Sequence, residues 1–348
     1  MLMDEYRVAA SDPSLPSLRL ALDREEVKRQ FKHRLPRLAG ENGFVRVRGV
    51  RVVRHKPGRR CLLEYDLRVE RPGDQRRRVR LLGKVRAGRF GNADYELSDA
   101  LWRRGFSASS ADGISVPEPI GTIPAFRMWL QRKVAGRPAA DLLAGPDGVV
   151  LAQRIAEAAH KIHECGIWPH REHTARDELR ILADCLDDVV AANPSLERRV
   201  KRLLVACERI GGRLPFSRRR PIHRDFYADQ VIVDGDRLHV VDFDLFCVGD
   251  PALDVGNFLG HVSEQALRLH GDPGALAHVE HALENRFCEL VGEQVRTVVR
   301  AYAALTLARH VYLSTVLDDR QALTERLLAL CEERVALLRP LPARDARA

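Results

Sequence analysis

Residues 223–244 read HRDFYADQVIVDGDRLHVVDFD, and this segment contains two short motifs. The first is a His-x-Asp sequence, in which Asp225 and Gln230 stand at opposite ends of one tight loop. The second is an Asp-Phe pair that begins at Asp242. Asp225 can accept a proton, while the side-chain oxygens of Gln230 and Asp242 can hold a metal ion. This spacing predicts a site for phosphoryl transfer.

A hairpin between the two motifs explains how they meet. The segment VIVDGDRLHVVDF contains two short alternating strands joined by Asp234 and Gly235, a pair that suits a turn with positive backbone angles. The antiparallel return of the chain carries Asp242 back beside Gln230. The sequence therefore predicts that these two metal-capable side chains lie close together.

The chain has 348 residues, which suits an enzyme of two lobes, and we place the boundary between residues 1–131 and 132–348. With 45% hydrophobic and 30% charged residues, its composition is typical of a soluble globular protein. No apolar run approaches the length of a membrane span, and the N-terminus lacks the pattern of an export signal. We expect a cytoplasmic protein without a membrane partner, and the sequence leaves monomer and homodimer open.

The formal net charge of +9 is concentrated in the N-terminal part. Residues 1–131 hold 27 Lys and Arg against 16 Asp and Glu, a net of +11, and the remainder holds 30 against 32, a net of −2. The basic residues alternate with apolar ones, as on the solvated face of an antiparallel sheet. Because no aromatic stacking pattern accompanies them, we expect no nucleic-acid partner.

Seven cysteines are scattered along the chain without a C-x-x-C pair. The odd number argues against a disulfide framework, so we expect reduced, mostly buried thiols. His160 and His163 lie three residues apart on a predicted helix, but no acid or thiol stands at metal-ligand spacing from them. We assign both histidines to the core or the surface.

Hydrophobic periodicity predicts an α+β chain with two unlike halves. In the N-terminal half we expect helices over 15–38 and 93–104, and strands over 44–54, 60–70, 78–86, 118–124 and 127–134. From residue 147 onward helical periodicity dominates, over 147–166, 176–192, 195–211, 252–270, 274–292, 294–316 and 318–338. The prediction is an N-terminal lobe with a five-stranded antiparallel sheet and a helix, followed by a mostly helical C-terminal lobe.

These motifs resemble the aminoglycoside phosphotransferase and choline kinase superfamily, small-molecule relatives of the protein kinases. The densest similarity lies in residues 223–258, where the family has H-G-D-x4-N, an Asp-Phe or Asp-Trp pair, and G-D-P-x-x-D. The resemblance covers most of the chain and implies a bilobal protein-kinase-like fold with ATP and Mg²⁺ as cofactors. In the family, the residues matched by Asp250 and Asp254 stabilise the catalytic core by hydrogen bonds to backbone. The short path from Asp242 to Asp250 leaves no activation loop, which favours a small-molecule acceptor over a protein.

The resemblance gives each residue of the opening stretch a role. Asp225 matches the catalytic Asp that accepts or orients the proton of the attacking hydroxyl, and Asp242 matches the Asp that binds Mg²⁺. Gln230 stands where the family usually has Asn, and its amide oxygen can bind a second Mg²⁺ without adding charge. His223 matches a structural histidine that orders the loop. Arg224 stands where small-molecule kinases often have Gly.

The nucleotide contacts that the resemblance implies lie in the N-terminal lobe. Lys84 matches the third-strand lysine that meets the phosphates, and Glu96 on the next helix matches its ion-pair partner. The adenine is expected to meet the backbone of the segment that links the lobes, Gln131, Arg132, Lys133 and Val134.

Two basic segments are further candidates for anion binding. Residues 56–60 (KPGRR) lie where kinases place a loop over the phosphates, and an ordinary hairpin turn is the alternative because the segment has one glycine. Residues 218–220 are three arginines before the catalytic loop, which suit either an anionic group or a solvated face.

The resulting interpretation is an ATP-dependent phosphotransferase acting on the hydroxyl of a small molecule: an aminoglycoside, a sugar or an amino alcohol. Acidic residues on the C-terminal helices suit a cationic acceptor, and solvated helix faces explain them equally well: Glu264, Glu280, Glu284, Asp318 and Asp319. The alternative function is a catalytically weak or inactive nucleotide-binding pseudokinase with a regulatory role, which Gln230 and the glycine-poor loop suggest.

Overall fold

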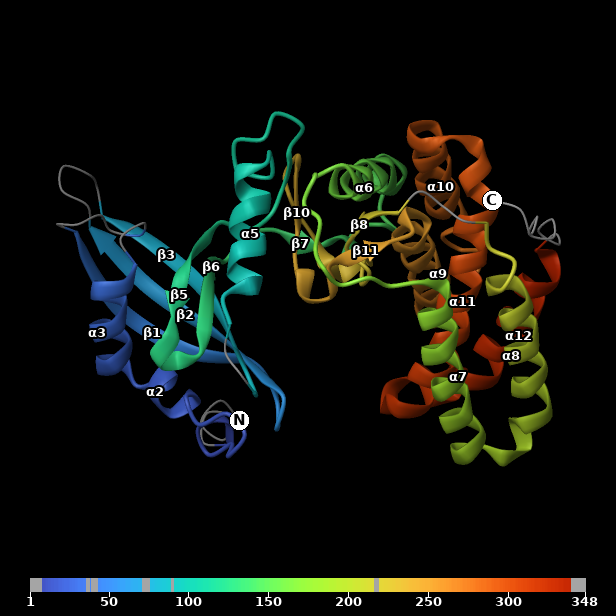
Figure 1. Ribbon diagram of the computed structural model, residues 1–348, viewed down its shortest axis with the longest axis horizontal. Coiled ribbons are helices and arrows are strands. Elements are labelled where there is room, and N and C mark those ends of the chain that lie inside the picture. Colours follow the sequence, from blue (N-terminus) through green and yellow to red (C-terminus); the bar gives the residue numbers. More distant parts are fainter. Residues whose placement is uncertain are drawn as a thin grey trace. The chain divides into compact units, whose positions relative to one another are not determined.

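The computed structural model describes residues 8–35, 38, 43–70, 76–88, 91–215 and 219–338 (Figure 1). The chain divides into two compact units. The first consists of Met1–Ala135 with Asp234–Val241, and the second of Gly136–Val233 with Asp242–Ala348. The sequence places the boundary after Gln131, whereas the structural division follows Ala135 and assigns part of the central hairpin to the first unit.

The first unit is built on a five-stranded antiparallel sheet with the strand order β1-β2-β3-β6-β5. Its strands are β1 (Phe44–Lys56), β2 (Arg60–Glu70), β3 (Arg77–Arg86), β5 (Pro119–Ile123) and β6 (Met128–Arg132). Each of them matches a predicted strand. Helix α5 (Ala93–Arg103) packs against β5 and β6.

The prediction of a single helix over 15–38 is wrong, because two helices occupy this segment. They are α2 (Leu18–Leu22) and α3 (Arg24–Arg34), and Asp23 between them has extended backbone. The Asp23 carboxylate accepts hydrogen bonds from the amides of Glu25 and Glu26, both at 2.9 Å. An aspartate that caps the second helix in this way ends the first.

Alternation along β2 and β3 gives the sheet two different faces. The face beneath α2 and α3 is apolar and buries Cys61, Leu63, Tyr65, Leu67, Val69, Leu81 and Val85. Tyr65 packs edge to face on Phe31, with ring centroids 5.0 Å apart, and its hydroxyl donates to the carbonyl of Ala21 at 3.0 Å. Because side chains alternate along a strand, Lys84 and Glu64 lie on the other face.

A short parallel pairing completes the first unit. Strand β4 (Ile114–Ser115) pairs with β10 (Arg237–Val240), with Leu238 opposite Ile114. The buried Ser115 hydroxyl lies 2.9 Å from Nδ1 of His239. This contact explains why Asp234–Val241 belongs to the first unit. A strand as short as β4 carries no periodicity and was not predicted.

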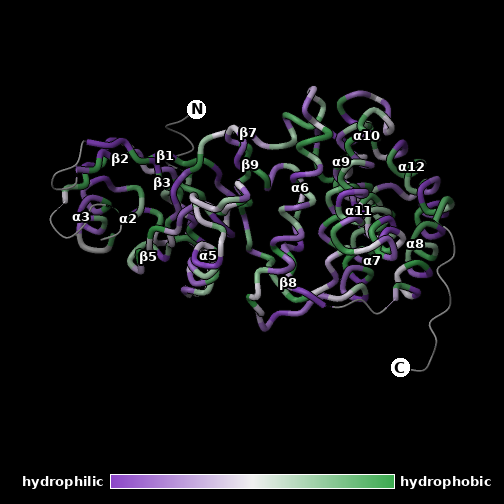
Figure 2. Tube along the Cα trace, turned by 90° about the horizontal axis from the view of Figure 1, so that it is seen from above, coloured by the Kyte–Doolittle hydropathy of each residue, from purple (hydrophilic) through white to green (hydrophobic). Residues whose placement is uncertain are grey.

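The second unit is mostly helical, which together with the antiparallel sheet confirms the α+β prediction. Its helices are α6 (Gly148–His163), α7 (Ala175–Ala192), α8 (Glu197–Gly211), α9 (Pro251–His270), α10 (Ala277–Val291), α11 (Arg296–Val316) and α12 (Thr324–Leu337). In Figure 2 hydrophobic and hydrophilic residues alternate along α6, as in a helix with one buried side. Two antiparallel ladders join β7 (Arg137–Pro138) to β9 (Val231–Asp234), and β8 (Arg220–Ile222) to β11 (Cys247–Gly249).

None of the seven cysteines forms a disulfide, and all but Cys185 are buried. Burial raises the pKa of Cys61, Cys207 and Cys247 to about 12 each, so these thiols stay protonated and unreactive. Within the described ranges, no helix has the length and apolar character needed to cross a membrane.

Helices α9 and α11 approach closely because α9 has glycines at the contact. A Cβ at Gly256 would lie 2.5 Å from Cβ of Tyr302 and 2.7 Å from the carbonyl oxygen of Val299. A Cβ at Gly260 would lie 2.8 Å from Cβ of Thr306. No real side chain tolerates such distances, so the two helices can pack at this spacing only with glycine.

We expect Gly256→Ala to lower the free energy of unfolding by roughly 1–3 kcal/mol, because the new methyl overlaps atoms of α11 that cannot turn aside. Urea denaturation followed by circular dichroism measures the change. Gly49→Ala is the control, since nothing lies within 4 Å of a Cβ there, and it should change the free energy by less than about 0.5 kcal/mol. Equal effects of the two substitutions would contradict the close contact.

Candidate active site

The two motifs of residues 223–244 lie next to one short ladder in the second unit. The first motif follows β8, and the second precedes β11. β8 ends at Ile222, directly before His223, and Ile222 is the register partner of Cys247 in β11. The first loop ends in the 3-10 turn Ala228–Gln230, which leads into β9. The second loop begins at Asp242 and leads into β11. The pairing therefore returns both loops to the same end of the ladder.

Asp254 on α9 holds the first loop in place. This residue is fully buried, and its carboxylate accepts hydrogen bonds from the amides of His223 at 2.8 Å and Arg224 at 2.6 Å. Nε2 of the buried His163 lies 2.9 Å from the same carboxylate. A buried carboxylate with three partners is a rigid support. The expected role of Asp254, hydrogen bonding to the backbone of the catalytic core, is confirmed.

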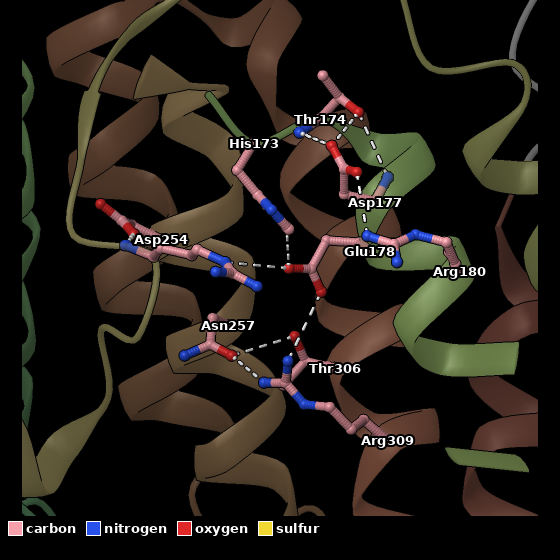
Figure 3. A network of polar contacts seen from close by, with 10 residues as sticks. His173, Thr174, Asp177, Glu178, Arg180, Asp254, Asn257, Thr306 and Arg309 are labelled. Carbon is pink, nitrogen blue, oxygen red and sulfur yellow. Dashed lines mark hydrogen bonds and ion pairs between the residues drawn. The ribbon is translucent and has the colours of Figure 1, made fainter. Parts of the chain in front are cut away.

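A second group of polar side chains supports the next part of the loop (Figure 3). Nδ2 of Asn257 donates to the carbonyl of Phe226, and Oδ1 of Asn257 accepts from Arg309, both at 2.9 Å. Arg309 also lies 3.6 Å from Glu178, which hydrogen-bonds to His173. Burial raises the pKa of Glu178, but the hydrogen bond to His173 and the charge of Arg309 outweigh burial and lower it. The network ties α7, α9 and α11 to the loop.

Arg224 has a φ of 69°, which lies in the left-handed region of backbone conformations. Glycine enters this region without strain, which explains why glycine suits this position in relatives. Two contacts hold arginine in the conformation: its amide donates to Asp254, and its Nε lies 3.9 Å from Glu178. Asp242 in the other loop is also left-handed, with a φ of 63°. Strained backbone therefore occurs in both loops, as is common at functional sites.

The ring of His223 connects the two loops. It is fully buried, and its centroid lies 4.7 Å from the ring of Phe243 and 5.7 Å from that of Phe226. Phe243 directly follows Asp242, so this contact fixes the start of the second loop against the first. The packing agrees with a structural role for His223.

The carboxylates of Asp225 and Asp242 influence each other. Burial raises the pKa of Asp225, the charges of His223 and Arg309 lower it, the charge of Asp242 raises it, and the net shift is upward. Such an effect needs two carboxylates at short range. The charge of Asp242 thus acts on Asp225, whereas the closeness of Asp242 to Gln230 stays a prediction.

Tyr227 links Gln230 to the carboxylates of Asp225 and Asp242. Gln230 is buried, and its backbone N–H donates to the carbonyl of Tyr227 at 2.9 Å. Burial raises the pKa of the Tyr227 phenol, the charges of Asp225 and Asp242 raise it further, and a hydrogen bond with the side chain of Gln230 lowers it. The charges of Asp225, Asp229 and Asp242 and the side chain of Gln230 therefore all act on one phenol.

The oxygens of Gln230 and Asp242 suit a metal ion that arrives with a ligand. Among the residues that the structure describes, no group of three or more His, Cys, Asp or Glu is arranged to hold a metal by itself. Mg²⁺ commonly takes one or two carboxylates from a protein and completes its octahedron with phosphate oxygens and water. One amide and one carboxylate fit this kind of binding.

Lys84 and Glu96, the predicted phosphate-binding pair, lie in the first unit. Lys84 is opposite Trp129 of β6, on the sheet face away from α2 and α3. Glu96 is exposed in the first turn of α5. An ion pair between this strand and this helix joins Arg86 to Asp94 at 3.3 Å. The pairing of Lys84 with Glu96 stays a prediction.

The segment that was expected to bind adenine, 131–134, includes the end of β6. The amides of Arg132 and Lys133 already donate to the carbonyls of Glu118 and Arg80, both at 2.8 Å. Gln131 is paired with Leu82 in the sheet. An adenine contact through the amide of Arg132 or Lys133 would require one of these bonds to open.

The side chain of Lys133 is bound to a buried carboxylate. Its Nζ donates to Oε2 of Glu64 at 2.5 Å, and Arg51 reaches the same oxygen at 2.7 Å. Burial raises the pKa of Glu64, but the hydrogen bonds from Lys133 and Arg51 outweigh burial and lower it. Lys133 therefore fastens the segment to β2.

The turn at 56–60 already holds an anion from its own chain. Gly58 has a φ of 69°, and its amide donates to the carboxylate of Asp12 at 2.9 Å. His55 lies 2.8 Å from the same carboxylate. Burial raises the pKa of Asp12, but the hydrogen bonds from Gly58 and His55 outweigh burial and lower it. A phosphate at this amide would have to displace Asp12.

The arginines before the catalytic loop form ion pairs where the structure describes them. Arg219 lies 2.5 Å from Glu172, and Arg220 lies 3.2 Å from Glu164. Arg218 lies outside the described residues. The pairs at Arg219 and Arg220 favour the surface interpretation of this segment.

A model of the Phosphotransferase enzyme family matches residues 93–302, which is more than half of the chain and includes both loops. The chain belongs to this family. The match confirms the resemblance seen in the sequence. A search of curated proteins finds no match to this phosphotransferase.

Solved structures similar to this phosphotransferase include aminoglycoside phosphotransferases and choline kinases. A thermostable mutant of aminoglycoside phosphotransferase APH(4)-Ia, in ternary complex with AMP-PNP and hygromycin B, has a TM-score of 0.55 at 17% identity and covers 84% of this chain and 94% of its own. Choline kinase from Cryptosporidium parvum Iowa II has a TM-score of 0.54 at 11% identity, with 90% and 95% covered. A putative aminoglycoside phosphotransferase from Ralstonia eutropha JMP134 has a TM-score of 0.57 at 12% identity, with 90% and 97% covered. The fold of the phosphotransferase is therefore protein-kinase-like.

Several residues of the site gave little or no signal in the sequence. Asn257 follows Asp254 by three residues and so lies on the same side of α9, which sequence spacing alone could have suggested. His163, Glu178 and Arg309 lie on other helices, far from the loop in sequence. Only the packing of α6, α7 and α11 brings them to the loop of this phosphotransferase.

We expect Asp254→Asn to lower the free energy of unfolding by roughly 1.5–3 kcal/mol, because the amide loses charge-assisted hydrogen bonds to two backbone N–H groups. Urea denaturation measures the loss. Asp272→Asn is the control, since Asp272 is exposed and its bond from the amide of Gly274 can be kept by an asparagine oxygen. Equal stability of the two variants would show that Asp254 does not support the loop.

Proposed function

We propose that this phosphotransferase transfers the terminal phosphate of ATP to a hydroxyl group of a small molecule. The observation that supports it best is that the two loops carrying Asp225, Gln230 and Asp242 meet at the end of the β8–β11 ladder, where Asp254 and His223 hold them. A proton acceptor beside two oxygen ligands is the arrangement that phosphoryl transfer requires. The AMP-PNP bound to aminoglycoside phosphotransferase APH(4)-Ia supports a nucleotide as donor.

In this proposal Asp225 orients the acceptor hydroxyl and receives its proton. The oxygen of the acceptor forms a bond to the terminal phosphorus as the bond from that phosphorus to the bridging oxygen of ADP breaks. Burial raises the pKa of Asp225 and so makes its carboxylate a better proton acceptor than an ordinary aspartate. The fixed charge of Arg309 counteracts part of this rise in the pKa.

Asp242 and Gln230 would bind Mg²⁺ that arrives with the nucleotide, and Mg²⁺ when bound neutralises charge on the phosphates. Lys84 would contribute a further positive charge to the phosphates, positioned by Glu96. For the adenine, the amide of Val134 and the carbonyls of 131–134 are the better candidates, because the amides of Arg132 and Lys133 are already bonded. The protein thus contributes position and electrostatics.

Asp225→Asn should lower kcat by at least about 100-fold while nucleotide binding is kept, because the amide cannot accept the proton. Asp242→Asn should weaken Mg²⁺-dependent nucleotide binding. ADP release over a panel of hydroxyl compounds measures turnover, and the mass of the product confirms phosphate transfer. Calorimetry with AMP-PNP, with and without Mg²⁺, measures nucleotide binding. Asp234→Asn is the matched control, because Asp234 is exposed and Asn-Gly suits the same turn.

Near-normal turnover by Asp225→Asn would contradict its assigned role. Binding of Mg²⁺ and AMP-PNP by the unmodified protein, without phosphate transfer to any member of the panel, would instead indicate a pseudokinase. The two results differ, because the first concerns one residue and the second concerns the function itself.

The role of Gln230 is tested by its dependence on Mg²⁺. Gln230→Ala removes the amide oxygen and should raise the Mg²⁺ concentration for half-maximal turnover by roughly 10-fold or more, as expected for the loss of a ligand or its support. Gln230→Asn restores the residue usual in the family and should keep the Mg²⁺ requirement within about 3-fold. An unchanged requirement in Gln230→Ala would exclude Gln230 as a ligand.

A further inference from the structure

The turn at 56–60 is held from one side of the sheet. His55, which contacts Asp12, is the register partner of Cys61 in β2. Cys61 belongs to the apolar face beneath α2 and α3, and partners in an antiparallel pair share a face. Burial raises the pKa of Cys61 and the charge of Asp12 raises it further, as expected for neighbours on one face. Asp12 therefore reaches the turn from the side of α2 and α3.

The backbone N–H groups at the tip of this turn have no capacity left for a phosphate. Pro57 has no N–H, and the N–H of Gly58 donates to Asp12 at 2.9 Å. The N–H of Arg59 donates to the carbonyl of Lys56 at 3.0 Å. A turn binds phosphate through its backbone when successive N–H groups point at the anion. In this turn, which the structure describes in full, those groups are already bonded.

On the opposite face of the sheet, the strand register puts three cations side by side. Lys56 is opposite Arg60, and Arg60 is opposite Arg86. We call Lys56, Arg60 and Arg86 the cationic row. Its members are half-buried, and the Cβ atoms of opposite residues lie about 4.5–5.5 Å apart. Because the adjacent residues Cys61 and Val85 belong to the apolar face, alternation places the row on the face away from α2 and α3.

Lys84, the predicted phosphate-binding lysine, lies beside the cationic row. It precedes Arg86 by two residues in β3, so it lies on the same face, about 7 Å away along the strand. Its register partner Leu62 is in turn opposite Arg54, an exposed cation of the same face. This end of the face therefore carries a cluster of positive side chains.

The acids near this cluster do not balance it. Asp94 and Glu96 lie in the first turn of α5, and Asp94 is 3.3 Å from Arg86. Glu64 lies on the same face of the sheet, but it is already bound to two other cations. Asp94 and Glu96 together carry fewer charges than the cationic row and Lys84. The net charge at this end of the face is therefore positive.

The cationic row weakens the sheet and suits an anion. Like charges directly opposite each other destabilise an antiparallel pair. The row has three of them in succession, and the contact of Asp94 with Arg86 compensates one. A phosphate over the row would attract every member, and a guanidinium can bind two phosphate oxygens at once. Such an arrangement indicates an anion-binding site.

We propose that the side chains of the cationic row, beside Lys84, hold the phosphates of the nucleotide in place of the backbone of the turn. Asp12 is then a positioning residue, because it fixes the turn from the other face and with it Lys56 and Arg60. The inference rests on the proposed phosphotransferase function and names the residues that meet its phosphates.

The first experiment measures the binding of AMP-PNP by calorimetry in the presence of Mg²⁺. Arg60→Gln removes the central charge of the row and should weaken binding by at least about 10-fold, as expected for the loss of charge-assisted hydrogen bonds. Arg60→Lys keeps the charge and should stay within about 3-fold of the unmodified protein. Arg46→Gln is the matched control, because Arg46 is an exposed cation of the same face at the other end of β1, and it should change binding by less than about 2-fold.

A thermal melt of the nucleotide-free protein separates binding from a merely structural role. Arg60 lies between two like charges, so Arg60→Gln relieves repulsion and should leave Tm within about 2 °C or raise it. A fall in Tm of more than about 4 °C would assign Arg60 to the structure of the sheet and overturn the inference.

The second experiment tests Asp12. Asp12→Ala should speed hydrogen exchange of the Gly58 amide by at least about 10-fold and weaken AMP-PNP binding by about 3-fold or more, because the turn is no longer fixed. Asp12→Asn keeps an oxygen for the Gly58 amide and should retain binding within about 3-fold. Tighter AMP-PNP binding by Asp12→Ala would show that phosphate competes with Asp12 for this amide, and would overturn the inference.

Unchanged AMP-PNP binding by Arg60→Gln would also overturn the inference. Failure of the proposed function has a different signature. An unmodified protein that binds AMP-PNP but transfers no phosphate would contradict the function and leave the cationic row as a nucleotide site. An unmodified protein that does not bind AMP-PNP at all would contradict both.

Discussion

The buried carboxylate of Asp254 is the interaction on which the active site depends. It cannot lie in the core without donors, and it takes two of them from consecutive backbone amides of the catalytic loop. This requirement fixes the loop to α9, and the glycine contact of α9 with α11 fixes α9 in turn. The positions of Asn257 and Arg309 follow from the same two helices. A single buried charge therefore couples helix packing to the geometry of Asp225.

The strained backbone at Arg224 and Asp242 is intelligible in this setting. Left-handed residues other than glycine persist only where their surroundings hold them, and here the Asp254 contacts and the packing of His223 on Phe243 do so. Between these loops the charges of Asp225 and Asp242 interact. The balance of burial, the charge of Asp242 and the charge of Arg309 raises the pKa of Asp225.

Sequence predicted the fold well where signals are local and repeated. The five strands of the first sheet and the helices from α6 onward follow from periodicity, because a buried face must recur at the period of its element. Short elements such as β4, β8 and β11 escaped, since two or three residues carry no periodicity. The single leading helix was wrong because Asp23 caps a second helix within it. The burial of Glu264 and Glu284 also escaped, because their arginine partners are distant in sequence or a turn away.

The chemistry available to this protein follows from the order and spacing of Asp225, Gln230 and Asp242 on two loops joined by a hairpin. Order and spacing are local properties, so they can be read from the sequence without a structure. The charges that surround those residues, in contrast, depend on the fold. Burial and long-range packing neutralise Glu264 and Glu284, fix Arg309 beside Asp225, and leave His261 and His310 uncharged. The pKa of a group in a folded protein depends on its burial and on the charges near it, and both are set by tertiary packing.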